Sequence, residues 1–308
     1  MNSSTSISKR WLLLFLAALL STAGIGWLYA SHLEPETQFW VSVFEKRRAE
    51  MATRSPAPHL LFTGDSACSF GIDARAITAA TGIPAYNLGG TRQMGLRVFL
   101  DEALGQAQKG DTLILICNPD LLIEDPRTRA TKAGAQMALA LPRNSTFPEK
   151  IQASRPGFNH LMTLGAKLAL GLPPFPYHLS GYQPLGQITT EIRATQTGRD
   201  KPLQKTKADV TAASNTLTLW NERCRAKGVT LTYLLPLELT HPDSLTENRN
   251  AKNLFLEKLA DQNHGVTLIT TPASGCSADP TLFADTLFHL TAAGAAQFSQ
   301  DLALRIPR

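Results

Sequence analysis

Short apolar runs that alternate with helical stretches are the feature that most limits the folds open to this chain. Three runs have strand length and end at glycine or polar residues, at 59–63, 84–88 and 111–117. Apolar residues with helical spacing lie between them, at 72–81 and 93–108. Strands separated by helices favour a parallel sheet with crossover helices.

This alternation is interrupted by a long irregular stretch and then returns. Residues 119–205 contain several prolines and short helical pieces, and we interpret them as an insertion. The later elements are predicted as helices at 208–227, 247–262 and 291–304 and strands at 229–235 and 266–270. The predicted fold is a three-layer α/β/α sandwich with a mainly parallel sheet, formed by residues 58–308.

An uncharged apolar segment, residues 11–30, precedes this body. As a helix, twenty residues cover roughly 30 Å, the thickness of a bilayer core. We therefore predict a transmembrane anchor, with a cleaved signal peptide as the alternative. Lys9 and Arg10 lie directly before it, which predicts a cytoplasmic N-terminus (1–10) and a body on the periplasmic side of the inner membrane. Residues 31–57 are predicted to form a helical stalk.

Charge and cysteine content exclude two other classes of protein. The chain has 30 lysines and arginines against 25 aspartates and glutamates, a net charge of +5, without a long basic run. That balance is too weak for a nucleic-acid-binding face. The four cysteines form no CxxC pair, so we predict no metal site. We predict no cofactor either.

The segment after the first strand, LLFTGDSACSFG, places a serine at the edge of the predicted sheet. Ligands bind beyond the carboxyl ends of parallel strands, and Gly64 permits a tight turn at that point. Ser66 then lies near the start of a helix, where backbone N–H groups can stabilise an oxyanion. An ordinary Asp-Ser turn that caps the helix would explain the same residues.

A histidine and an acid lie just before the last predicted helix. In FADTLFHLTAAG, His289 precedes Thr291, which we expect to cap the helix, and Asp285 lies four residues upstream of His289. An imidazole that takes a proton from serine needs an acceptor for its other nitrogen. Asp285 supplies one if the loop folds back. Asp279 is the rival acid, and His241 is a weaker rival for the base.

These segments together resemble the SGNH (GDSL-like) hydrolase family. The matching blocks are Gly64-Asp65-Ser66 after the first strand, Asn87-Leu88-Gly89-Gly90 after the second, and Asp285 and His289 before the last helix. The resemblance implies that Ser66 is the nucleophile, His289 the general base and Asp285 its orienting acid.

The family also implies an oxyanion hole with three kinds of donor. They are the Ser66 N–H, a glycine N–H from Gly89 or Gly90, and the side chain of Asn118; Asp65 and Asn87 would support them. The chain departs from the family in the third block, usually Gly-x-Asn-Asp, because no glycine precedes Asn118. The acid and base, usually three residues apart, are four apart here.

The resemblance implies a membrane-anchored serine esterase or O-acyltransferase, with acetyl as the favoured acyl group. Its substrate would be a cell-envelope or extracellular polysaccharide, and its partner a multi-spanning membrane acyltransferase. The alternative is a non-catalytic subunit that binds polysaccharide or scaffolds such a complex. A lipase or thioesterase would use the same residues but needs a hydrophobic acyl pocket, and we place it third.

Overall fold

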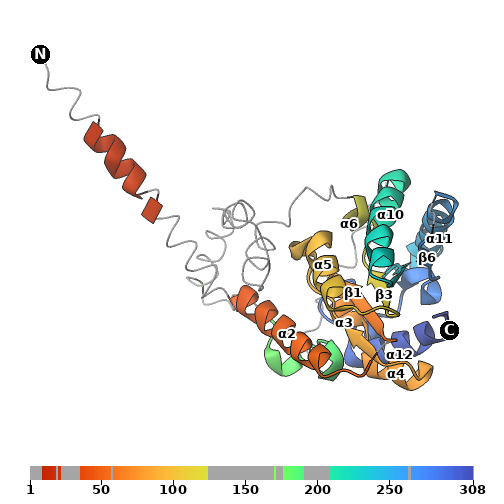
Figure 1. Ribbon diagram of the computed structural model, residues 1–308. Helices are drawn as coiled ribbons and strands as arrows, with labels where there is room; N and C mark the ends of the chain where they lie inside the picture. The colour runs from red at the N-terminus through yellow and green to blue at the C-terminus, as the bar shows by residue number, and fades with distance from the viewer. Residues whose placement is uncertain are drawn as a thin grey trace, which may run out of the picture.

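A five-stranded parallel sheet forms the centre of the fold (Figure 1). The computed structural model describes residues 9–18, 20–21, 35–56, 58–123, 170, 176–190, 209–262 and 265–307. The strands run in the order β2-β1-β3-β4-β6, and every neighbouring pair is parallel. Their bounds are β1 Leu60–Gly64, β2 Ala85–Asn87, β3 Thr112–Ile116, β4 Thr230–Leu234 and β6 Thr267–Leu268. All five predicted strands and the mainly parallel sheet are confirmed.

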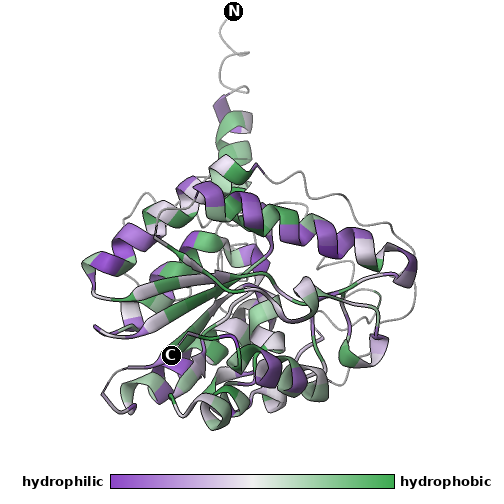
Figure 2. Ribbon diagram, turned by 90° about the vertical axis from the view of Figure 1, so that its right-hand side faces the viewer, coloured by the Kyte–Doolittle hydropathy of each residue, from purple (hydrophilic) through white to green (hydrophobic). Residues whose placement is uncertain are grey.

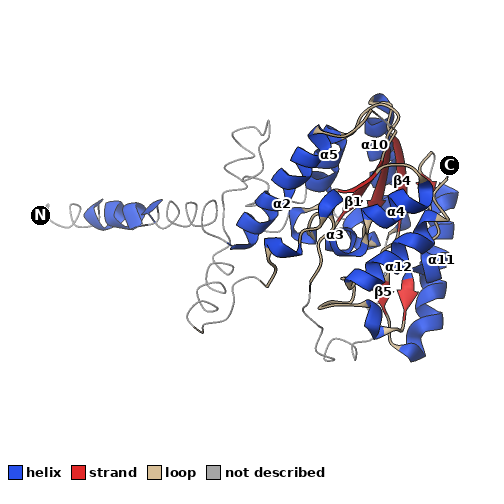
Figure 3. Ribbon diagram, turned by 90° about the horizontal axis from the view of Figure 1, so that it is seen from below, coloured by secondary structure: helices blue, strands red, loops and turns tan. Residues whose placement is uncertain are grey.

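Helices cover both faces of this sheet (Figure 3). One layer contains α2 (Pro35–Ala52), α5 (Leu96–Gln106), α10 (Val210–Ala226) and α11 (Leu245–Gln262), and the other contains α4 (Ala74–Thr81) and α12 (Ala292–Ala303). Alternate strand residues face opposite layers, as the two-residue repeat of a strand requires. Leu61 and Leu113 belong to the first core, and their neighbours Leu60 and Ile114 belong to the second.

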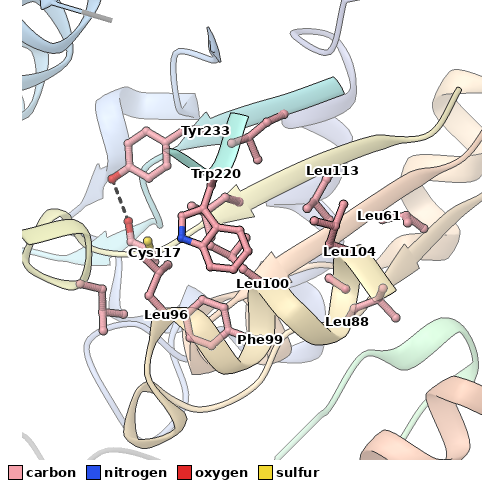
Figure 4. Close-up of a cluster of buried hydrophobic side chains, with 14 of the residues drawn as sticks. Leu61, Leu88, Leu96, Phe99, Leu100, Leu104, Leu113, Cys117, Trp220 and Tyr233 are labelled. Carbon is pink, nitrogen blue, oxygen red and sulfur yellow. Dashed lines mark hydrogen bonds between the residues drawn. The ribbon is translucent and has the colours of Figure 1, made fainter. Parts of the chain in front are cut away.

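The first core is packed mainly with leucine and aromatic side chains (Figure 4). Phe99 and Leu100 of α5 lie in it with Trp220 of α10, and all three side chains are buried. The Tyr233 hydroxyl donates a hydrogen bond to the Cys117 carbonyl at 3.0 Å, so the only polar atom of that ring has a partner. Colouring by hydropathy shows the apolar character of the strands between the mixed surfaces of the helices (Figure 2). All four cysteines are free and buried.

The predicted stalk, residues 31–57, is helical but does not stand apart from the domain. Within α2, Phe39, Trp40, Val43 and Phe44 are buried in the first core. The Arg47 side chain is also buried, and it donates to the carbonyls of Gly89 and Gly186. The prediction of a separate stalk is therefore wrong over α2, because the hydrophobic side chains of this helix need the domain to cover them.

The predicted anchor lies only partly in the described chain. Residues 9–18 and 20–21 are helical, and residues 19 and 22–34 lie outside the described residues. No helix among the residues that were described is both long and apolar enough to cross a bilayer.

The predicted insertion, 119–205, is described over 119–123, 170 and 176–190. The short elements here and elsewhere are α3 Ser66–Gly71, η1 Arg92–Met94, α6 Pro119–Ile123, η2 Leu179–Gly181, η3 Pro184–Gly186, η5 Pro242–Ser244, η6 Pro272–Gly275 and η7 Pro280–Leu282. A small parallel pair, β5 (Glu238–Leu239) with β7 (Cys276–Ser277), was not predicted, since two-residue strands leave no pattern in a sequence. Residues 176–190 pack against the domain, with the Ile188 N–H donating to the Ser69 carbonyl at 3.0 Å.

Candidate active site

Ser66 is the first residue of α3, directly beyond the carboxyl end of β1. At Gly64, β1 lies very close to β3: a Cβ atom at this position would be 1.8 Å from the Ile116 carbonyl oxygen. Its φ of +151° is also a conformation that favours glycine. Only glycine fits there, and the chain can then turn sharply into α3. Ser66 is half-buried, and its hydroxyl has no hydrogen-bond partner among the described residues. The hydroxyl is therefore free to react.

Asp65 is the buried N-cap of α3. Its carboxylate accepts a hydrogen bond from the Ala67 N–H at 3.0 Å and another from the backbone of Asn118. These bonds join the ends of β1 and β3 and fix the start of the helix. Burial raises the pKa of the Asp65 carboxyl to about 7, although the Ala67 N–H and the charge of Arg92 oppose that shift.

A folded-back loop, residues 283–290, carries the predicted acid and base. Phe283 and Leu290 form an antiparallel bridge, and the Ala284 N–H donates to the His289 carbonyl at 2.8 Å. Inside the loop, the Thr286 hydroxyl accepts a hydrogen bond from the His289 N–H at 3.0 Å. This closure places Asp285 and His289 side by side, so a spacing of four residues still allows the two side chains to meet. Thr291 then caps α12, as predicted, by accepting from the Gly294 N–H.

The side chains of His289 and Asp285 form a hydrogen-bonded pair, which we call the dyad. His289 Nδ1 lies 2.9 Å from Asp285 Oδ1, and the imidazole is buried. Burial by itself raises the pKa of the Asp285 carboxyl, but the hydrogen bond and charge of His289 and a hydrogen bond from Tyr177 outweigh it and lower the pKa overall. Asp285 is therefore ionised and can orient the imidazole. Nε2 of His289 makes no hydrogen bond within the described part of the chain.

The dyad is held against the helix that begins with Ser66. The His289 ring stacks on Phe70 of α3, with 4.2 Å between ring centroids and 17° between ring planes. Phe70 lies four residues after Ser66, so both residues are on the same face of the helix, one turn apart. The helix that begins at Ser66 thus packs against a pair of side chains that lie more than two hundred residues later in the sequence.

The second predicted block is built into the back of α3. The amide of Asn87 donates to the carbonyls of Cys68 and Ile72 at 2.9 and 3.0 Å and also reaches the Ser69 carbonyl. A Cβ atom on Gly89 would lie 2.7 Å from the Ser69 nitrogen, so only glycine allows this contact. Asn87 thus ties the end of β2 to α3 and to the residue that follows it.

The two glycine N–H groups predicted for the oxyanion hole already donate hydrogen bonds within the protein. The Gly89 N–H donates to Asn87 Oδ1 at 3.0 Å, and the Gly90 N–H donates to the Gly64 carbonyl at 2.7 Å. Neither N–H is therefore available to a ligand in this structure. Asn118 is half-buried at the end of β3, next to the Arg92–Asp120 ion pair of 2.5 Å.

The two rival residues have other roles. Asp279 is exposed and caps η7 by accepting from the Thr281 N–H at 2.9 Å. His241 is exposed too, and its Nδ1 accepts from the Asp243 N–H at the start of η5. Among the described residues neither makes a hydrogen bond to the dyad, and Asp285 is the acid that contacts His289.

Tyr177 is the residue that sequence reasoning missed. Its hydroxyl donates to Asp285 Oδ2 at 2.5 Å and lies 3.2 Å from His289 Nδ1. The residue comes from the predicted insertion, more than a hundred positions before the dyad, and no motif surrounds it. The stretch 173–186, rich in proline and aromatic residues, was the available signal. Among the described residues, no group of histidine, cysteine and acidic side chains could hold a metal ion.

Comparison with known proteins adds little to this geometry. The chain matches no family model and no curated protein. It is similar to a solved structure from Streptococcus pneumonia, described as a candidate platelet activating factor, with 14% identity and a TM-score of 0.40 over 94% of this chain and 97% of that chain. Similarity at this level says nothing about a shared activity, and the site stands on its own residues.

Proposed function

We propose that the protein is a serine esterase or O-acyltransferase of the SGNH type, with Ser66, His289 and Asp285 as catalytic residues. One observation carries the proposal: the dyad, with Nδ1 and Oδ1 2.9 Å apart, stacks on Phe70 of the helix that begins at Ser66. A nucleophile at a sheet edge, a base packed against the same helix and an acid on the far nitrogen of that base are the parts that acyl transfer needs.

The proposed reaction has two halves. His289 Nε2 takes the proton of Ser66 as the oxygen attacks the ester carbonyl, and Asp285 stabilises the imidazolium without being protonated. The tetrahedral intermediate then expels the alcohol, which receives the proton from His289, and the acyl group stays on Ser66 as an ester. Water or a sugar hydroxyl attacks this ester in the second half, again with His289 as base.

The oxyanion hole of this proposal differs from the expected one. With the N–H groups of Gly89 and Gly90 engaged, the Ser66 N–H and the Asn118 amide are the proposed donors. Asn118 follows β3 directly, and its backbone is fixed to Asp65, so its side chain starts from a rigid position beside Ser66.

The proposed place of action is the periplasmic face of the inner membrane, on an acetylated envelope polysaccharide, with a multi-spanning acyltransferase as partner. The charge asymmetry around residues 11–30 and the family resemblance support it. The N-terminal helix adds a second argument, because Trp11, Leu13 and Phe15 are each more than 60% exposed. A cluster of exposed apolar side chains on one helix favours a lipid environment.

The test uses the full chain in detergent, as wild type and as Ser66→Ala. Each protein is incubated with 4-nitrophenyl acetate and with a fluorophosphonate probe, and the labelled residue is located by mass spectrometry. We expect the probe on Ser66 and no turnover in the variant. Circular dichroism serves as the folding control. A folded wild-type protein that takes no label would refute the serine mechanism and favour the non-catalytic scaffold, to which the engaged glycine N–H groups already point.

A further inference from the structure

We infer that Tyr177 is a positioning residue for the dyad: its hydroxyl holds the second oxygen of Asp285 and so fixes how the carboxylate meets His289. The inference rests on the proposed function. Asp285 Oδ2 accepts from the Tyr177 hydroxyl at 2.5 Å, while Oδ1 faces His289 Nδ1 at 2.9 Å. A carboxylate held through both oxygens cannot rotate away from the imidazole, and a fixed orienting acid keeps the base in its working tautomer.

The phenol ring of Tyr177 is itself fixed by aromatic neighbours from two helices. Its centroid lies 4.9 Å from that of Phe70 on α3 and 6.2 Å from that of Phe39 on α2. The His289 ring closes the group edge-on at 6.0 Å. Three rings, from α2, α3 and the 283–290 loop, therefore pack around the Tyr177 ring and hold it in place beside Asp285.

The chemistry of the hydroxyl suits this role. Burial raises the pKa of Tyr177 well above its ordinary range, and the neighbouring Asp285 and Glu36 of α2 raise it further. Tyr177 is therefore a neutral phenol at any working pH and donates a hydrogen bond to Asp285. That hydrogen bond is one of the contributions that favour the ionised form of Asp285.

The test compares Tyr177→Phe with Tyr182→Phe in the full chain, using 4-nitrophenyl acetate from acid to alkaline pH. Tyr177→Phe keeps the ring and removes one hydrogen bond to a charged group, so we expect kcat to fall about 10- to 100-fold with KM nearly unchanged. Without this donor the Asp285 carboxylate bonds more strongly to the protonated form of His289, so the acid limb of kcat/KM moves to higher pH. Tyr182→Phe is the matched control, because Tyr182 lies in the same segment but beside Glu50 and Arg47. It should leave both kcat and the acid limb of kcat/KM unchanged.

Two further measurements separate positioning from a merely structural role. In an Asp285→Asn background, Tyr177→Phe should have little further effect, because Tyr177 acts through that carboxylate. Replacing Tyr177 by 3,5-difluorotyrosine keeps the packing and strengthens the donor, so the acid limb should move to lower pH. Equal losses in both backgrounds, or a pH profile that neither variant moves, would overturn the inference.

The inference and the proposed function can fail separately. If the folded wild-type protein has no turnover and takes no label on Ser66, the proposed function fails, and the hydrogen bond is then followed by NMR of protein with ¹⁵N-labelled histidine. A changed Nδ1 signal of His289 in Tyr177→Phe, assigned with a His289→Gln variant, supports positioning of the dyad. An unchanged signal refutes it.

Discussion

The imidazole of His289 lies flat against the phenyl ring of Phe70, with centroids 4.2 Å apart and planes inclined by 17°. Because Phe70 belongs to the helix that begins at Ser66, this stack sets the distance between a loop near the C-terminus and the proposed nucleophile. The contact is thus both a part of the core and a part of the site.

Phe70→Leu separates these two contributions. A leucine keeps most of the buried apolar surface, so we expect the free energy of unfolding to fall by about 1 to 2 kcal/mol. It offers no flat ring to His289, so kcat should fall about 10- to 100-fold through misplacement of the base. Urea unfolding and esterase kinetics measure the two effects. Phe99→Leu, at an equally buried position on α5, should lose similar stability and keep its activity; equal activity losses in both variants would contradict the argument.

Asp285→Asn should abolish most of the activity, whereas Asp279→Asn should not. An amide facing Nδ1 can hold the imidazole in the wrong tautomer, so kcat should fall about 1,000-fold or more. Asp279 is exposed and only caps η7, so its replacement leaves the base untouched. Steady-state kinetics of the two variants decide between the acids. Activity lost with Asp279 rather than with Asp285 would show that the dyad is assigned to the wrong carboxylate.

Asp65 gives the fold a pH dependence of its own. The folded protein keeps a proton on this buried carboxyl up to about pH 7, whereas an unperturbed carboxyl loses it near 3.8. The unfolded chain therefore binds fewer protons in this interval, so the contribution of Asp65 to stability falls as the pH rises through it.

Asp65→Asn should remove that dependence while its oxygen still accepts from the Ala67 N–H. Between pH 4 and 7 the wild-type protein should lose up to about 4 kcal/mol relative to the variant. Urea unfolding at a series of pH values measures the difference. Stability curves that stay parallel would mean that the carboxyl titrates near its ordinary value.

Arg47→Met should destabilise the protein more than Arg48→Met, although the two arginines are adjacent. Without Arg47, the Gly89 and Gly186 carbonyls lose their donor inside the protein, which costs about 3 kcal/mol. Arg48 makes a partly exposed pair with Glu102 at 2.6 Å, worth about 1 kcal/mol. The midpoints of urea unfolding report both changes. Equal midpoints would show that the Arg47 bonds contribute little.

The sheet and its helices could be predicted because each strand is an apolar run of five or so residues between helix signals. The limits of β1, β3 and β4 lie within one or two residues of the predicted ones. The packing of α2 against the domain was not predicted, because basic residues such as Lys46, Arg47 and Arg48 usually lie on a solvated surface. In the fold the Arg47 side chain points inward and donates to backbone carbonyls. Local sequence patterns cannot predict this burial, because the carbonyls belong to residues far away in the sequence.

The site was predictable where a motif marks a strand end, as at Ser66, or a helix start, as at His289. The 283–290 loop folds back and brings Asp285 to His289, which is the condition on which the choice of this acid depended. Tyr177 was not predictable, since its partners lie on elements more than a hundred residues away. The hydrogen bonds of the Gly89 and Gly90 N–H groups could not be predicted either, because they depend on how residues 87–90 pack against α3 and β1.

The incorporation of α2 into the core changes how far the site can travel from a membrane. If residues 11–30 are the proposed anchor, only residues 31–34 separate it in sequence from α2. Four residues cover at most about 15 Å when fully extended. Under the proposed function, the candidate site would therefore stay within that distance of the bilayer surface and would meet only acyl groups presented close to it.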